Sequence, residues 1–129
     1  MKKRAIKKIL RWLPAAVVVC LIFIASATHG SDLPQLGSFD LFVKKGGHMI
    51  GYALLAMACF WAAYGDTKNM IRSVIISLSI AIAYAALDEY HQSFRPGRYP
   101  SVTDVGIDAV GAIIGVGIAA FFTGLRSKY

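Results

Sequence analysis

Charged residues are scarce in this sequence. Lys, Arg, Asp and Glu make up 16% of its 129 residues, whereas soluble domains usually carry about 25% charge. Hydrophobic residues make up 57% of the chain, and the mean hydropathy is +0.57. A soluble helical bundle would need a polar stripe along each helix, and apolar stretches such as PAAVVVCLIFIA have none. The composition therefore favours one membrane-embedded domain over a soluble protein.

Several common catalytic and cofactor-binding motifs are also missing. The two cysteines, Cys20 and Cys59, lie within apolar runs, where we expect them to serve as packing residues. No phosphate-binding glycine loop, Ser-His-Asp arrangement or HxxxH or HExxH spacing can be found. Arginines near the histidines would also repel a metal cation. We therefore expect no cofactor and no metal.

Four apolar runs approach the length of a membrane span. A spanning helix takes about 20 apolar residues, with about 17 tolerated, and backbone polar groups in lipid must be satisfied within the segment. The predicted fold is therefore an all-α bundle of four transmembrane helices. These helices form a membrane domain over residues 12–129, after a basic tail at residues 1–11. The expected spans are Trp12–Thr28, Gly46–Tyr64, Met70–Leu87 and Val105–Thr123.

The first run has a second interpretation. A basic start, an apolar core and Ala25-Ser26-Ala27 also fit a signal peptide with an A-x-A cleavage site. Cleavage would leave three spans with the same topology. We expect the run to remain as a span.

The basic residues are distributed unevenly. With four spans, ten of them fall on one side: Lys2, Lys3, Arg4, Lys7, Lys8, Arg11, Lys68, Arg72, Arg126 and Lys128. The positive-inside rule then predicts that both termini are cytoplasmic. The N-terminal tail would orient the chain and meet anionic lipid, and we expect no nucleic-acid partner. Asp66 is the one acid on this side, and we expect it to be a solvated turn residue.

The polar residues on the other side recur at helical spacing. Lys44, His48 and Tyr52 are four residues apart, and Lys45 is three before His48. Ionisable groups within a membrane are unfavourable unless they face protein or water. We therefore expect three helix faces to meet. The first face carries the residues Lys44, Lys45, His48 and Tyr52. The second carries Tyr84, Asp88, His91 and Gln92, with Glu89 beside them. The third carries Asp104, Asp108, Gly111 and Gly115. The GxxxG spacing of these glycines allows close backbone approach.

Three interpretations of this polar cluster stay open: a structural ion-pair network, a pocket for an anionic headgroup, and a catalytic site. Transport is disfavoured because the other halves of the helices are almost entirely apolar. Arginine and lysine can hold phosphate or carboxylate, and a histidine beside a carboxylate can exchange a proton. The candidates for proton exchange are His48, Asp88, Glu89 and His91. The candidates for substrate binding are Lys45, Tyr52, Gln92, Arg95, Arg98, Asp104 and Asp108.

Taken in order, these residues form a recognisable pattern. It comprises Lys45-x-x-His48-x-x-x-Tyr52-x-x-Leu55, then DEYHQSFRPGR, then Ser101-x-x-Asp104-Val105-x-x-Asp108-x-x-Gly111, and Ser26 also fits. The pattern resembles the VanZ-like family of small bacterial membrane proteins. Gly51 departs from it, because members often carry an acid there.

The resemblance implies a compact helical membrane domain in the bacterial inner membrane. From it and from the polar cluster we expect binding or modification of an anionic cell-envelope lipid or lipid-linked precursor. A non-catalytic shielding role is the alternative. The family's namesake is linked to resistance to the glycopeptide teicoplanin, so glycopeptide resistance is an expectation to test for this member. Whether the protein is an enzyme stays open.

Overall fold

The computed structural model describes residues 1–28, 38–96 and 99–128. These residues form four helices and no strand: α1 (Lys2–Thr28), α2 (Ser38–Thr67), α3 (Met70–Gln92) and α4 (Val102–Arg126). All four are long and apolar enough to cross a membrane. The predicted all-α fold with four candidate spans is therefore confirmed.

The helices extend beyond the apolar runs that predicted them. α1 begins at Lys2 and continues through Pro14, so the basic tail is helical, and α2 begins at Ser38 rather than Gly46. Lysine and arginine are good helix formers, so a helix does not end where its hydrophobicity ends. The 30 residues of α2 span about 45 Å, against about 30 Å for a hydrocarbon core. Its ends therefore lie at or beyond the membrane interfaces.

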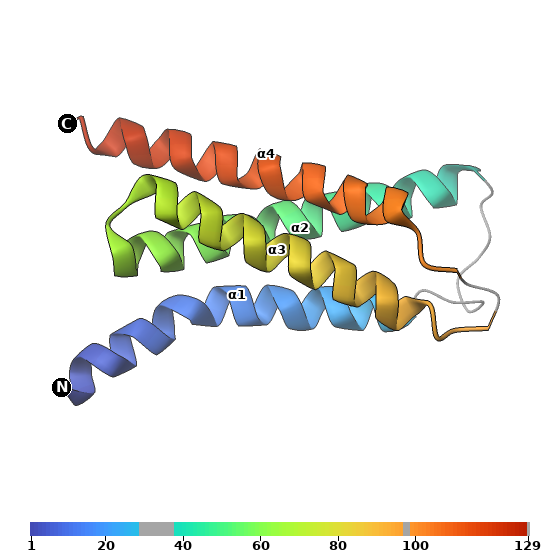
Figure 1. The fold of residues 1–129 in the computed structure, drawn as a ribbon, viewed down its shortest axis with the longest axis horizontal. Helices are drawn as coiled ribbons and strands as arrows, with labels where there is room; N and C mark the ends of the chain where they lie inside the picture. Colours follow the sequence, from blue (N-terminus) through green and yellow to red (C-terminus); the bar gives the residue numbers. More distant parts are fainter. Residues whose placement is uncertain (29–37, 97–98, 129) are drawn as a thin grey trace.

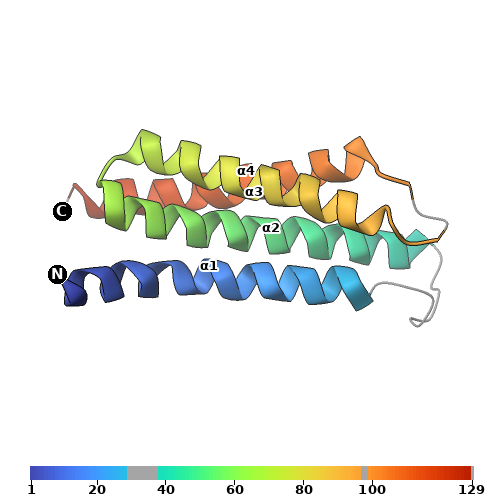
Figure 2. The same cartoon turned by 60° about the horizontal axis from the view of Figure 1, so that its bottom comes forward.

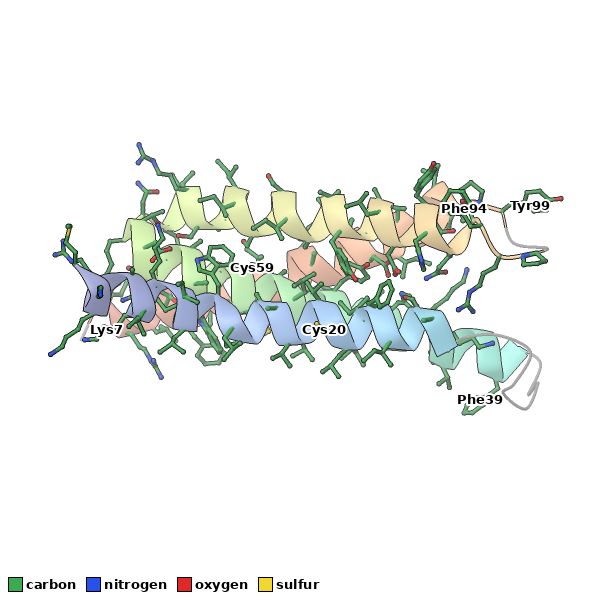
Figure 3. All side chains as sticks on the ribbon, turned by 90° about the horizontal axis from the view of Figure 1, so that it is seen from below. Lys7, Cys20, Phe39, Cys59, Phe94 and Tyr99 are labelled. Atoms are coloured by element: carbon green, nitrogen blue, oxygen red, sulfur yellow. The ribbon has the colours of Figure 1, made fainter. Side chains whose placement is uncertain are left out.

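The helices lie side by side in an elongated bundle (Figures 1 and 2). Both chain termini and the α2–α3 turn lie at one end, which we call the terminal end. The start of α2, the end of α3 and the start of α4 lie at the opposite end, which we call the site end. Figure 3 shows Lys7 at the terminal end and Phe39, Phe94 and Tyr99 at the site end.

α2 is the central helix. It packs against α1, α3 and α4, whereas α1 touches α3 only sparsely and, within the described residues, does not contact α4. Tyr52, Leu55, Ala56 and Phe60 on α2 are fully buried. Much of the remaining core consists of alanine, which lets the helices approach closely.

Two glycines place α4 directly on the backbone of α2. A Cβ added at Gly111 would lie 2.3 Å from the carbonyl oxygen of Met49, and one at Gly115 would lie 2.2 Å from that of Ala53. Any side chain would therefore hold the helices apart. The close approach expected from Gly111-x-x-x-Gly115 is confirmed.

Asp66 joins α1 to α2 at the terminal end. Arg11 Nη1 donates to Asp66 Oδ1 at 3.1 Å and to the Gly65 carbonyl oxygen at 2.7 Å. Trp12 Nε1 donates to Asp66 Oδ2 at 3.2 Å, and Lys8 Nζ lies 3.8 Å from the same oxygen. The expectation that Asp66 is a solvated turn residue is therefore wrong. The helical start of α1 carries its basic and indole side chains to this carboxylate, a contact that hydropathy cannot indicate.

Candidate functional site

Asp88 is the centre of a buried polar network at the site end. It lies near the end of α3 and is 5% exposed. Its Oδ2 atom accepts hydrogen bonds from Ser26 Oγ at 2.9 Å, Tyr52 OH at 3.3 Å and Gln92 Nε2 at 3.3 Å. Hydrogen bonds to a carboxylate are stronger than those between neutral groups. This one oxygen therefore ties α1, α2 and α3 together.

His48 lies between two carboxylates. Its Nδ1 atom is 4.0 Å from Asp88 Oδ2 and 3.9 Å from Asp108 Oδ1, and its ring stacks beside that of Tyr52 with centroids 6.4 Å apart. Both aspartates are buried, whereas the histidine side chain is 19% exposed. The structure thus brings residues from the three predicted helix faces together at His48. A histidine in contact with carboxylates is suited to exchanging a proton.

The start of α4 is held to both of its neighbours. Lys45 Nζ lies 3.4 Å from Asp104 Oδ1 in a half-exposed ion pair. Glu89 Oε1 accepts a hydrogen bond from the Ser101 backbone N–H at 2.9 Å, and Ser101 Oγ accepts one from the Asp104 N–H at 3.3 Å. Glu89 is thereby placed on the residue that caps α4. The role that this geometry gives Glu89 is to position that helix.

The remaining predicted residues lie away from Asp88 or outside the described residues. His91 is exposed, and its ring faces Phe23 of α1 with centroids 5.3 Å apart. Arg95 Nη2 donates to the Ala27 carbonyl oxygen. Arg98 lies outside the described residues. Of the two histidines considered for proton exchange, the structure places His48 against the buried carboxylates.

Ser26 is a member of the network that was absent from the predicted site residues. It is 1% exposed, and its hydroxyl donates to Asp88 across the α1–α3 interface. The usable signals were one hydroxyl at the end of an otherwise apolar run and the fit of Ser26 to the VanZ-like pattern. The first signal was ambiguous, because Ala25-Ser26-Ala27 also fits a cleavage site.

A partly open groove lies beside this network, between α1 and α2. Its volume is about 270 Å³, slightly below the range of roughly 300–1,000 Å³ typical of small-molecule pockets. A Cβ added at Gly47 would meet nothing within 4 Å, so the missing side chain helps to keep the groove open. The walls are mainly apolar, with two basic side chains on α2. The lining residues are Ile22, Ala25, Val43, Lys44, Gly47 and His48.

The charged residues at the site end lie at two depths, with basic residues at the surface and carboxylates beneath them. Lys44, Lys45 and Arg95 are partly exposed, and we call them the basic rim. On α2 the rim lysines lie about one helical turn nearer the site end than His48. Asp88 and Asp108 are buried beneath them. Within the described residues, no group of three or more His, Cys, Asp or Glu side chains is arranged to hold a metal ion.

Comparison with known proteins places the chain in one family. The VanZ/LLP1 family model matches residues 10–123, nearly the whole chain. No curated protein and no solved structure matches it. The match covers α2 and α3 in full and most of α1 and α4, and it includes every residue of the Asp88 network. The chain belongs to the VanZ/LLP1 family, as a helical membrane protein with four apolar helices.

Proposed function

We propose that this protein is a multi-pass protein of the bacterial inner membrane that binds an anionic cell-envelope lipid or lipid-linked precursor at its site end. The observation that carries this proposal is the groove between α1 and α2. Its walls of Ile22, Ala25 and Val43 suit part of a lipid chain, and Lys44 and His48 line it too. An amphiphile with a negative headgroup matches both parts of this surface.

The position of the groove supports entry of the ligand from the bilayer. It lies between two helices that are each long and apolar enough to span a membrane. A lipid can therefore enter the groove laterally from the bilayer without leaving the membrane. The basic rim lies at the end of the bundle, where a headgroup would be. Lysine and arginine there can hold a phosphate.

The distribution of charge supports the orientation of the site. Six of the basic residues precede Trp12, and Arg126 and Lys128 follow at the other terminus. The two termini lie at the same end of the bundle (Figure 1). By the positive-inside rule this end is cytoplasmic, so the groove faces the extracytoplasmic side.

Chemical modification of the bound lipid is the second candidate function. It is favoured by one observation: His48 both lines the groove and lies about 4 Å from two buried carboxylates. Such a histidine can move a proton to or from a bound group. Binding without turnover would produce the shielding role instead. Comparing envelope lipids and glycopeptide sensitivity in deletion and overexpression strains separates these outcomes, because only turnover yields a new lipid product.

Lipid titration of the purified full-length protein tests the proposal. We expect phosphatidic acid and phosphatidylglycerol to bind in preference to phosphatidylcholine, with the preference weakened by salt. Gly47→Leu should block the groove without a clash of its Cβ. Gly46→Leu is the matched control, because its added Cβ also meets nothing within 4 Å and Gly46 does not line the groove. Equal binding by both variants, or no preference for anionic lipids, would overturn the proposal.

A further inference from the structure

A buried acceptor atom in the Asp88 network lacks a hydrogen bond. Gln92 is 2% exposed, and its Nε2 atom donates to Asp88. Its Oε1 atom is buried and has no hydrogen-bond partner among the described residues. Native proteins rarely leave a buried carbonyl oxygen without a donor, because such an atom has lost its water without replacement.

Asp108 offers a second acceptor group, a carboxylate on α4 that faces His48. The residue is 6% exposed, and its carboxylate lies 3.9 Å from His48 Nδ1. Gln92 and Asp108 are linked through His48 and Asp88, since His48 lies within 4.0 Å of both aspartates. α3 therefore supplies a buried acceptor without a donor, Gln92 Oε1, and α4 supplies a carboxylate that faces His48.

We infer that the lipid bound at this site carries hydrogen-bond donors beyond its phosphate, as hydroxyl or primary ammonium groups. This inference rests on the proposed function and narrows its ligand class. The basic rim would hold the phosphate, while Gln92 Oε1 and the Asp108 carboxylate would accept from the donors of the headgroup. A headgroup with a bare phosphate would leave Gln92 Oε1 unsatisfied.

Ser26 shows how such a donor fits the network. Its hydroxyl already donates to Asp88 from α1, in the manner expected of a ligand hydroxyl. α1 is the least packed helix, with sparse contacts to α3 and none to α4 within the described residues. A small outward movement of its end would withdraw Ser26 from Asp88 and open the network toward the groove, which His48 lines. A ligand donor that enters there can then reach Gln92 Oε1.

Two pairs of lipids with matched charge and matched acyl chains test this inference on the purified full-length protein. Phosphatidylglycerol is compared with phosphatidylpropanol, which lacks its hydroxyls, and phosphatidylethanolamine with phosphatidylcholine, which lacks its N–H donors. We expect the donor-bearing member of one pair to bind about tenfold more tightly, as for a hydrogen bond to a buried acceptor. Preference within the first pair identifies hydroxyl as the donor, and preference within the second identifies ammonium.

Substitutions then test whether Gln92 and Asp108 account for the preference for the donor-bearing lipid. Gln92→Met and Asp108→Leu each remove an acceptor and should reduce the ratio of affinities within the preferred pair to about threefold or less. Asp66→Leu makes the same chemical change as Asp108→Leu at the terminal end and should leave the ratio unchanged. Because a ratio is measured, a variant that is only less stable still shows the preference.

Each remaining outcome overturns a stated claim. Equal affinity within both pairs, with anionic lipid still bound, overturns the inference and leaves the proposed function standing. A preference that persists in both variants also overturns it, since other groups would then recognise the donor. Failure to bind any of these lipids or phosphatidic acid overturns the proposed function as well.

Discussion

The contact between α2 and α4 yields the sharpest prediction about stability. At Gly115 an added Cβ would lie 2.2 Å from the Ala53 carbonyl oxygen, about 1 Å inside the usual closest carbon–oxygen approach of about 3.3 Å. The atoms in contact belong to the backbones of α2 and α4, which cannot move aside as a flexible side chain can. Gly115→Ala must therefore displace α4, at a cost of about 1–3 kcal/mol for overpacking. Gly111→Ala should cost a similar amount for the same reason.

The matched control is Gly117→Ala on the same helix, where the added Cβ meets nothing within 4 Å. There the gain in helix propensity should leave stability unchanged or raise it by up to about 1 kcal/mol. Denaturant unfolding in detergent micelles measures the three variants. Displacement of α4 would also carry Asp108 away from His48, so lipid binding should weaken in Gly111→Ala. Equal stability of all three variants would refute the close-packing argument.

Two other predictions concern the carboxylates that join the helices. Asp88→Ala removes the shared acceptor of three buried donors and should cost about 3 kcal/mol of unfolding free energy. Asp88→Asn keeps an acceptor oxygen and should cost less. Denaturant unfolding of both variants measures the two losses, and equal losses would contradict this prediction. Asp66→Ala should free the start of α1 and speed tryptic cleavage after Arg11 about fivefold, matching a part-exposed contact worth about 1 kcal/mol. Limited proteolysis measures that rate with Asn69→Ala as the control, and unchanged cleavage would show that Asp66 does not hold α1.

The fold could be predicted from the sequence because lipid imposes a simple rule. Four runs without a central charge leave the backbone no alternative to helices. The helix ends could not be predicted in the same way. The starts of α1 and α2 contain charged residues yet remain helical, and hydropathy detects only apolar length.

The candidate site could be predicted in part, for a geometric reason. Spacing of four residues places His48 and Tyr52 on one face of α2, and both face Asp88 in the structure. Spacing says nothing about which neighbouring helix a side chain meets. His91 therefore shares a helical arc with Asp88 in the sequence, yet faces Phe23 on α1. Ser26 joins the network from a helix with no other predicted site residue.

Crosslinking with a photoactivatable lipid tests the central claim most directly. Phosphatidylglycerol with a diazirine in its acyl chain would be irradiated with the full-length protein, and the labelled residues mapped by mass spectrometry. A lipid bound in the groove predicts labels concentrated at Ile22, Ala25 and Val43, which unlabelled phosphatidylglycerol removes by competition. Labels spread evenly over the exposed apolar residues of all four helices, including Ile113 and Ile118 of α4, would contradict a specific lipid site.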